Sequence, residues 1–374
     1  MTADSRGRLL GIKQAEGEKT MTKLKMALLC SVLGAMITGI VLCSWGIVPT
    51  AALSYGVGSR IRSLSARSLT QSFPALPSVP QLGAGSTEEQ TDQETVPVFS
   101  EAPVFSPVDY TVSIPSEPKG AEKIVSKQYP SSLSVNNSSD KEIDVTALLN
   151  RVPDLDFSGD GPQILIVHTH TSESYNETGQ DWYTDQDTRT TDNSRNMVRM
   201  GEVLSQVLTE AGYRVIHCQK RHDKDFNASY DQSEQTVKKY LEKYPSIAVV
   251  IDLHRDSLID SGGTKYRPTV TINGEPTAQV MLLMGVGNEN YIHPTWEDNI
   301  SLALRIQRQA QTDYPGFMRP TLVRPLLYNQ YLSSGAMLVE LGGCGNSPAE
   351  AEAAARRFGE ICAKALDEIR EEQT

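Results

Sequence analysis

Apolar residues gather in short runs along the C-terminal part of the chain. The runs lie at 164–170 (ILIVHTH), 213–218 (YRVIHC), 246–254 (SIAVVIDLH), 279–286 (QVMLLMGV) and 336–341 (AMLVEL). Short aliphatic and β-branched runs without strict alternation are typical of strands that are buried on both faces of a sheet. We therefore expect these runs to be the strands of a central sheet.

Between the strands, apolar residues recur at intervals of three and four, which predicts helices. The helices are expected at 194–211, 231–243, 296–312 and 348–370. Ser347 fits the N-cap of the last helix, and Pro348 fits its first helical position. Asn273 and Gly274 separate two strand-like runs, as in a two-residue β-hairpin. The predicted fold class is α/β, with a mixed, mostly parallel sheet flanked by helices.

A different pattern occupies residues 26–48, which are apolar and carry no charge. At the helical rise of about 1.5 Å per residue, this segment is long enough to cross a hydrocarbon core of about 30 Å. The small residues that follow, at 50–52, make a poor cleavage site, which favours an uncleaved anchor over a signal peptide. The flanking charges favour an N-terminus inside the cell.

The segment that follows is rich in Ser, Pro, Thr, Gln and Glu, and its apolar residues are too scattered to bury a core. It is expected to be a flexible tether. The predicted organisation is a cytoplasmic tail at 1–25, a transmembrane helix at 26–48, a linker at 49–140 and a catalytic hydrolase domain at 141–374.

Charge and cysteine content argue against several classes of protein. The net charge of −11 argues against a nucleic-acid partner, which would require a basic stripe. None of the five cysteines lies in a C-x-x-C pair, so the sequence predicts neither a zinc ribbon nor a disulfide framework.

Histidines follow two of the predicted strands, at His170 and His254. In an open α/β sheet, ligands bind at the carboxyl ends of the strands. A catalytic zinc ion takes three protein ligands from His and carboxylate side chains and leaves one position open. Glu173, three residues after His170, can supply the third ligand if the chain turns there. His168 is an alternative to His170, although it lies deeper in the strand.

Two acidic positions complete the predicted site. Asp252 or Asp256 can accept a hydrogen bond from His254 and fix its tautomer. Glu340 follows four apolar residues, and a glutamate in such a place is expected to face a cleft or a metal, where it can transfer protons. The structural alternative for Glu340 is a salt bridge to Arg324.

The strings HTHTSESY, DLHRD and LVELGG, behind a single span and a Ser/Pro-rich tether, resemble the stage II sporulation protein P family of membrane-anchored peptidoglycan hydrolases. The string HDKDFNASYDQS at 222–233 and the loop at 328–332 also fit. The family is similar to zinc-dependent N-acetylmuramoyl-L-alanine amidases, whose metal is held by two histidines and a glutamate.

The resemblance implies a site of this kind on this chain. His170 and His254 match the histidine ligands of Zn²⁺, and Glu340 matches the catalytic carboxylate. Glu173 is the expected third ligand, with Glu177 as the alternative because the amidase ligand lies farther from the first histidine.

The resemblance also implies a biological setting. It predicts cleavage of the amide between muramic acid and the stem peptide, with a second endopeptidase activity on cross-links. The place of action would be outside the cell membrane, at the sporulation septum and during engulfment. The implied partners are a lytic transglycosylase (SpoIID-like) and a polytopic membrane protein (SpoIIM-like). Two other hypotheses stay open at this point: a non-catalytic cell-wall scaffold, and a zinc peptidase or deacetylase.

Overall fold

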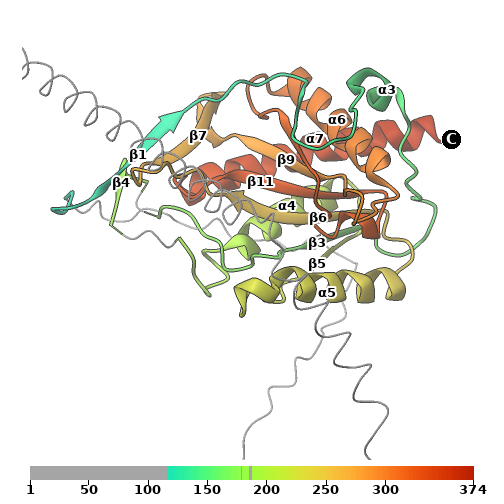
Figure 1. Ribbon diagram of the computed structural model, residues 1–374, viewed down its shortest axis with the longest axis horizontal. Coiled ribbons are helices and arrows are strands. Elements are labelled where there is room, and N and C mark those ends of the chain that lie inside the picture. Colours follow the sequence, from blue (N-terminus) through green and yellow to red (C-terminus); the bar gives the residue numbers. More distant parts are fainter. Residues whose placement is uncertain (1–115, 178, 185–187) are drawn as a thin grey trace, which may run out of the picture. The chain divides into compact units, whose positions relative to one another are not determined.

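A seven-stranded sheet forms the centre of the computed structural model, which describes residues 116–374 except 178 and 185–187 (Figure 1). In spatial order the strands are β2 (Val135–Asn137), β10 (Thr321–Arg324), β9 (Val280–Gly285), β11 (Ala336–Gly343), β6 (Val249–Asp256), β3 (Ile164–Val167) and β5 (Val215–His217). The pair β9–β11 is antiparallel, and the other neighbours are parallel. The predicted mixed, mostly parallel sheet is therefore confirmed.

Helices cover both faces of this sheet, because consecutive side chains of a strand point to opposite sides. On β3, Ile164 and Ile166 belong to one apolar core, whereas Leu165 and Val167 belong to another. The first core is covered by α4 (Met197–Glu210), α6 (Trp296–Asp313) and α7 (Pro348–Glu372), and the second by α5 (Ser229–Lys243) (Figure 1). The four helices lie where the apolar spacing predicted them.

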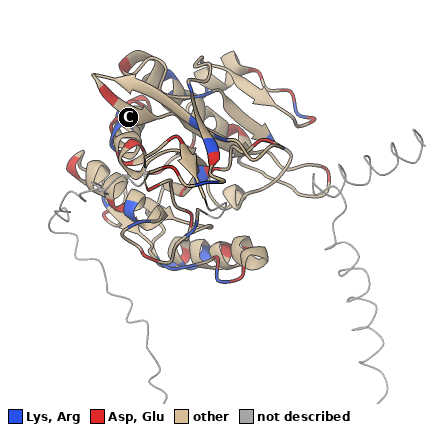
Figure 2. Cartoon of the chain, turned by 90° about the vertical axis from the view of Figure 1, so that its left-hand side faces the viewer, with Lys and Arg blue, Asp and Glu red and all other residues tan. Residues whose placement is uncertain are grey.

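The helix ends follow the local chemistry of the sequence. Ser347 caps α7 in a capping box, in which its hydroxyl accepts from the Glu350 amide and the Glu350 carboxylate accepts from the Ser347 amide. On its outer face α5 carries ion pairs such as that of Lys238 with Glu234, and Figure 2 shows acidic and basic residues interspersed there. Exposed pairs of this kind contribute little to stability, so the buried face holds α5 in place.

A second, smaller sheet has the strand order β4 (Trp182–Tyr183), β1 (Glu122–Lys127), β7 (Lys265–Ile272) and β8 (Glu275–Ala278). The strands β7 and β8 form the predicted hairpin, and they are antiparallel. At the turn, Asn273 and Gly274 have φ values of 53° and 82°, the left-handed conformation that two-residue hairpin turns need.

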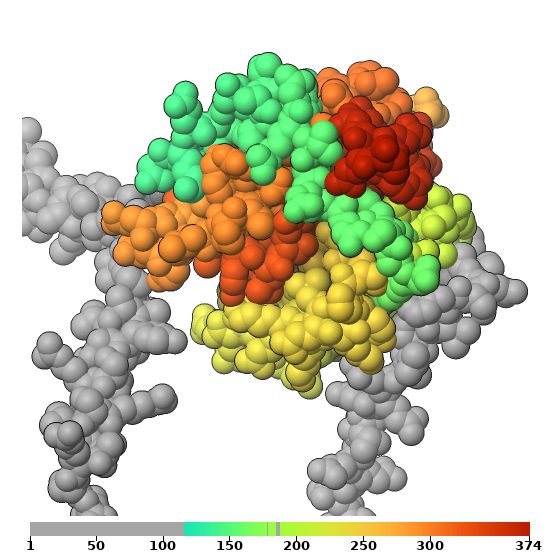
Figure 3. All heavy atoms as spheres, turned by 90° about the vertical axis from the view of Figure 1, so that its right-hand side faces the viewer, coloured from blue at the N-terminus to red at the C-terminus, as the bar shows by residue number. Residues whose placement is uncertain are grey.

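The structure corrects the predicted end of the linker at residue 140. The strands β1 and β2 both lie in the segment assigned to the tether, yet β1 pairs with β7 and β2 pairs with β10. Only Ile124 of these two strands is buried, so backbone hydrogen bonds rather than an apolar pattern hold them. The segment continues over the surface to α3 (Val145–Asn150) and lies beside the end of α7, where Gln373 donates to the Pro153 carbonyl (Figure 3).

The predicted tail at 1–25 and the predicted span at 26–48 lie outside the described residues. Within residues 116–374, apart from the gaps, no helix has the length and apolar character that crossing a membrane requires.

Candidate metal centre and active site

Three neighbouring parallel strands carry the predicted site. The order β11, β6, β3 brings the carboxyl ends of these strands to one edge of the central sheet. His254 lies within β6 and faces Glu340 in the register of β11, while His170 and Glu173 lie in the loop after β3. The 170–173 loop is a tight turn, in which the Glu173 amide donates to the His170 carbonyl at 3.1 Å.

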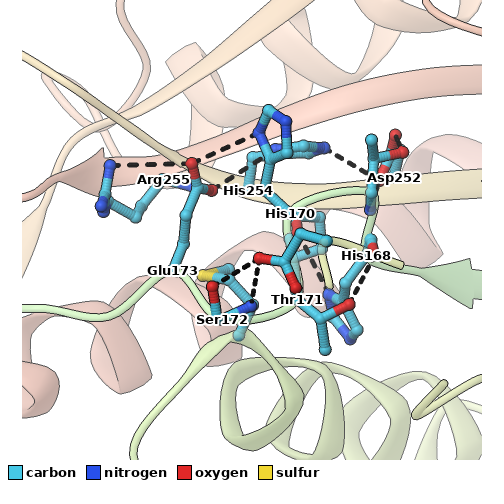
Figure 4. Close-up of polar contacts among 12 residues, drawn as sticks. His168, His170, Thr171, Ser172, Glu173, Asp252, His254 and Arg255 are labelled. Atoms are coloured by element: carbon cyan, nitrogen blue, oxygen red, sulfur yellow. Dashed lines mark hydrogen bonds and ion pairs between the residues drawn. The ribbon is translucent and has the colours of Figure 1, made fainter. Parts of the chain in front are cut away.

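The turn brings a potential metal-binding group together. Ligand atoms of His170, Glu173 and His254 all lie within 4.8 Å of one another. His170 Nδ1 is 3.5 Å from one Glu173 oxygen, and His254 Nδ1 is 3.4 Å from the other (Figure 4). Glu173 and His254 are buried, whereas His170 is partly exposed. Two imidazoles and one carboxylate match the donors of a catalytic zinc site, with room for a fourth ligand.

Asp252 contacts the ring nitrogen of His254 that does not face Glu173. The Nε2 atom of His254 lies 2.9 Å from Asp252 Oδ1, in an ion-pair contact that is poorly aligned for a hydrogen bond. Asp252 is fixed in turn by the amide and the hydroxyl of Thr169, at 2.8 and 2.6 Å. Burial lowers the pKa of His254, but the charges of Asp252 and Glu173 outweigh it and hold this pKa well above its usual value. Of the two predicted partners of His254, Asp252 is therefore the one in place, and Nδ1 faces Glu173.

Arginines hold the carboxylate of Glu173 and the loop around it. Arg255 contacts Glu173 at 3.7 Å through its guanidinium and donates to the carbonyls of Ser174 and Thr188, both at 3.0 Å. Arg189 reaches the same carboxylate at 3.3 Å. Although burial favours the protonated form, the hydrogen bonds from the two histidines and the charge of Arg255 keep the pKa of Glu173 well below its usual value. Glu173 is thus ionised and ready to bind a cation.

His168, the alternative to His170, is directed away from this group. Its Nδ1 contacts the Leu253 carbonyl at 3.1 Å, and its Nε2 contacts Nε2 of His217 at 2.8 Å. A carbonyl only accepts, so a neutral His168 carries its proton on Nδ1 and accepts from His217. Burial lowers the pKa of His168 to about 4. Both ring nitrogens of His168 have hydrogen-bond partners, so neither is available to a metal, and His168 is a structural residue beneath the loop.

Glu177, the alternative to Glu173, is also separate from the cluster. It forms an ion pair with Arg195 and lines a different cavity, of about 340 Å³.

Glu340 lies in the wall of a cavity of about 460 Å³ that it shares with His170, Glu173 and His254. Among the described residues, its buried Oε2 atom has no hydrogen-bond partner. Burial, followed by the charge of Asp256, raises the pKa of Glu340 to about 8. The alternative salt bridge is absent from the described part of the chain, where Arg324 donates to the Ser138 hydroxyl instead. Glu340 can therefore hold or release a proton near neutral pH beside the potential metal ligands.

Other residues of this cavity were not singled out from the sequence. They include Arg189, Phe226 and Tyr230. The Phe226 ring stacks on His170 with 4.7 Å between centroids, and the Tyr230 ring meets His170 edge-on at 5.7 Å. Both aromatic residues lie in the string at 222–233, so the one signal that could have identified them was their place in a motif shared with a family.

The fold and the site together define a mixed α/β protein with a potential catalytic metal centre at the carboxyl edge of its sheet. The chain belongs to the stage II sporulation protein P family, whose sequence model matches residues 79–363. It is 26% identical over 270 residues to stage II sporulation protein P of Bacillus subtilis (strain 168), an alignment that covers 68% of this chain. The alignment covers 62% of the relative, so the chain spans less than two thirds of the length of that protein.

Solved structures with some similarity include three amidases. The CwlD amidase from Clostridioides difficile, in complex with the GerS lipoprotein, has 12% identity and a TM-score of 0.37, covering 56% of this chain and 98% of that one. AmiC2 of Nostoc punctiforme has 11% identity and a TM-score of 0.32, covering 58% and 100%. The catalytic domain of CwlV from Bacillus (Paenibacillus) polymyxa var. colistinus has 9% identity and a TM-score of 0.32, covering 56% and 98%.

Proposed function

We propose that this chain is a zinc-dependent peptidoglycan hydrolase, and specifically an N-acetylmuramoyl-L-alanine amidase. One observation carries the proposal: His170, Glu173 and His254 converge on one point, with Glu340 in the wall of the same cavity. The donor set suits zinc, because two imidazoles and one carboxylate leave a coordination position open. Membership of the stage II sporulation protein P family supports a cell-wall substrate during sporulation.

In this proposal His170, Glu173 and His254 would hold the zinc ion, and the contact of Asp252 with Nε2 of His254 would leave Nδ1 free to bind it. When bound, zinc lowers the pKa of water and polarises a carbonyl. Glu340 takes the proton from the water that attacks the amide carbon and then delivers it to the departing L-alanine amine. A group with a pKa near 8 is suited to both steps, because it exchanges its proton readily at neutral pH.

The wider biological role is part of the same proposal. The enzyme would be anchored by the span at 26–48 with its catalytic domain outside the membrane, would also cut peptide cross-links, and would thin the septal wall during engulfment. A lytic transglycosylase and a polytopic membrane protein would be its partners. The match to the family over residues 79–363 and the apolar segment at 26–48 support this setting.

Product analysis tests the chemistry. The detergent-solubilised full chain would be incubated with labelled sacculi, with and without a chelator, and the new termini identified by mass spectrometry. We expect free L-alanine amines and muramic lactyl carboxylates, lost with chelator and restored by zinc. New D-alanine or glucosamine termini alone would instead indicate a peptidase or deacetylase. No release and no stoichiometric zinc would indicate a non-catalytic scaffold.

Glu340→Ala separates catalysis from metal binding in the same assay. It should retain zinc and lose turnover by about 10²–10⁴-fold, the usual contribution of a general acid–base group. Full digestion of sacculi by this variant would contradict the role given to Glu340.

A further inference from the structure

The string at 222–233 forms a wall that faces the metal-binding loop. It contains the short helix η1 (Phe226–Ala228) and the first turn of α5. Asp223 lies at its start and accepts from the Ser172 amide at 3.0 Å, which fixes the turn between His170 and Glu173. Phe226 and Tyr230 place their rings against His170. The wall therefore positions the loop and lines the cavity at once.

Tyr230 is a partly buried residue of this wall. Within residues 116–374 apart from the gaps, no hydrogen bond engages its hydroxyl, although its ring packs against His170 and, at 6.0 Å, against Tyr328. It lines the same cavity as Glu173, His254 and Glu340. A phenol with the usual pKa of about 10 is an O–H donor at neutral pH. Burial, followed by the nearby negative charge of Asp252, raises the pKa of Tyr230 further.

A strained loop supports this tyrosine from the far side. Tyr328 and Asn329 are consecutive residues with φ values of 48° and 58°, a conformation that costs energy in residues other than glycine. Nδ2 of Asn329 donates to the Tyr230 carbonyl at 2.9 Å and to the Ser233 hydroxyl at 3.0 Å. The loop is thus fastened to the helical turn that carries Tyr230. Strain of this kind persists where surrounding contacts enforce it, often at functional sites.

We propose that Tyr230 is a catalytic residue of the proposed amidase, whose hydroxyl donates a hydrogen bond to the carbonyl oxygen of the scissile amide as negative charge develops there. The inference rests on the proposed function. Water attacks the carbonyl carbon, and the π electron pair of the C=O bond moves onto the oxygen that Tyr230 contacts. As that pair re-forms the C=O bond, the C–N bond breaks and its electron pair stays on the nitrogen, which receives from Glu340 the proton taken from water. Tyr230 keeps its own proton throughout.

Tyr230→Phe tests this role because it removes one oxygen atom and keeps the ring against His170. Removal of one such donor typically lowers kcat by about 10²–10³-fold. We expect a loss of about 10²-fold in kcat, a KM within about twofold of the wild type, and unchanged zinc content. Tyr291→Phe is the matched control, because Tyr291 is 49% exposed in the loop after β9 and does not line the cavity. The control should have wild-type kinetics.

A binding measurement gives a readout that does not depend on turnover. A phosphinate isostere of the lactyl–L-alanine amide has a tetrahedral anion where the charge develops. Calorimetry should show binding weakened by about 10²-fold in zinc-loaded Tyr230→Phe, with Tyr291→Phe unchanged, as expected for a donor to a developing anion.

Three results would overturn the assignment: wild-type kcat and phosphinate affinity in Tyr230→Phe, a rise in KM alone, or loss of zinc. If the wild type cleaves no amide yet binds the phosphinate in a Tyr230-dependent manner, the amidase proposal fails while the donor role of Tyr230 stands.

Discussion

Two groups of histidines lie on either side of one short loop, and they have opposite chemistry. Beneath the loop, His168 and His217 use each other and the Leu253 carbonyl, and burial holds both pKa values below the usual range. Above it, His170 and His254 lie 3.5 and 3.4 Å from the Glu173 carboxylate, and all three residues line one cavity. The two histidines of the lower pair are neutral and have hydrogen-bond partners, whereas the upper group concentrates charge around a potential metal site. Hydrogen-bond partners, rather than residue type, therefore distinguish the structural histidines from the potential metal ligands.

The largest effect, on zinc content and turnover, is expected when one proposed ligand of the upper group is removed. His254→Ala removes one of three proposed ligands and should abolish stoichiometric zinc, with turnover reduced by roughly 10³-fold or more because the Lewis acid is lost. Metal analysis by mass spectrometry, together with sacculus digestion, measures both. Retention of one zinc per chain with near-normal turnover would place the metal elsewhere.

A smaller loss is expected from the residue that orients the upper group. Asp252→Asn keeps the shape of the side chain but removes the charge beside His254 Nε2, 2.9 Å away. Changes to the partners of metal ligands typically cost about 10–100-fold in affinity. Competition with a zinc-sensitive dye should therefore give a Kd raised by that factor. An unchanged Kd would show that Asp252 stabilises the fold and not the metal.

Because of Glu340, the free energy of unfolding of the protein should fall as pH rises. Burial, followed by the charge of Asp256, raises its pKa to about 8 from an ordinary 4.5, with His254, Glu173 and Arg319 also nearby. The folded state therefore binds this proton more tightly than the unfolded chain. The resulting stabilisation is complete below about pH 4.5 and is lost as pH rises through about 8.

Glu340→Gln lacks this loss, because an amide does not titrate. In metal-free protein at pH 8, we expect the variant to be more stable than the wild type by about 1–3 kcal/mol in urea unfolding, and the gap to shrink toward pH 5. A gap that is independent of pH would show that Glu340 titrates normally.

The smallest effect, on stability alone, is expected when an added methyl group presses on the lower pair, His168 and His217. A Cβ atom at Gly201 of α4 would lie 2.3 Å from Nε2 of His217 and 2.7 Å from Nε2 of His168. Gly201→Ala should therefore destabilise the protein by about 1–2 kcal/mol, despite the higher helix propensity of alanine. Thermal unfolding measures this loss, and zinc content should stay at the wild-type level. Loss of zinc in this variant would mean that the two groups of histidines are not independent.

The sequence predicted the long apolar strands and helices, and it missed the strands β1, β2 and β10. The central strands β3, β6, β9 and β11 and the four long helices follow from their apolar spacing. The strands β1 and β2 could not be predicted, because their pairing uses backbone groups that every residue carries.

The site was predictable to a similar extent. His170 follows β3, and His254 and Glu340 lie near the carboxyl ends of β6 and β11, where neighbouring parallel strands bring them together. The choice of Glu173 rather than Glu177 depends on a turn closed by one backbone hydrogen bond, and the aromatic wall around Tyr230 depends on packing across separate elements. Neither leaves a periodic signal in the sequence.

Anomalous diffraction from crystals of the zinc-loaded protein, measured at the zinc absorption edge, locates the metal. We expect one anomalous peak per chain, at about 2.0–2.2 Å from one nitrogen each of His170 and His254 and from a carboxylate oxygen of Glu173. A peak bound by His168 or by a cysteine, or no peak at this edge of the sheet, would contradict this expectation.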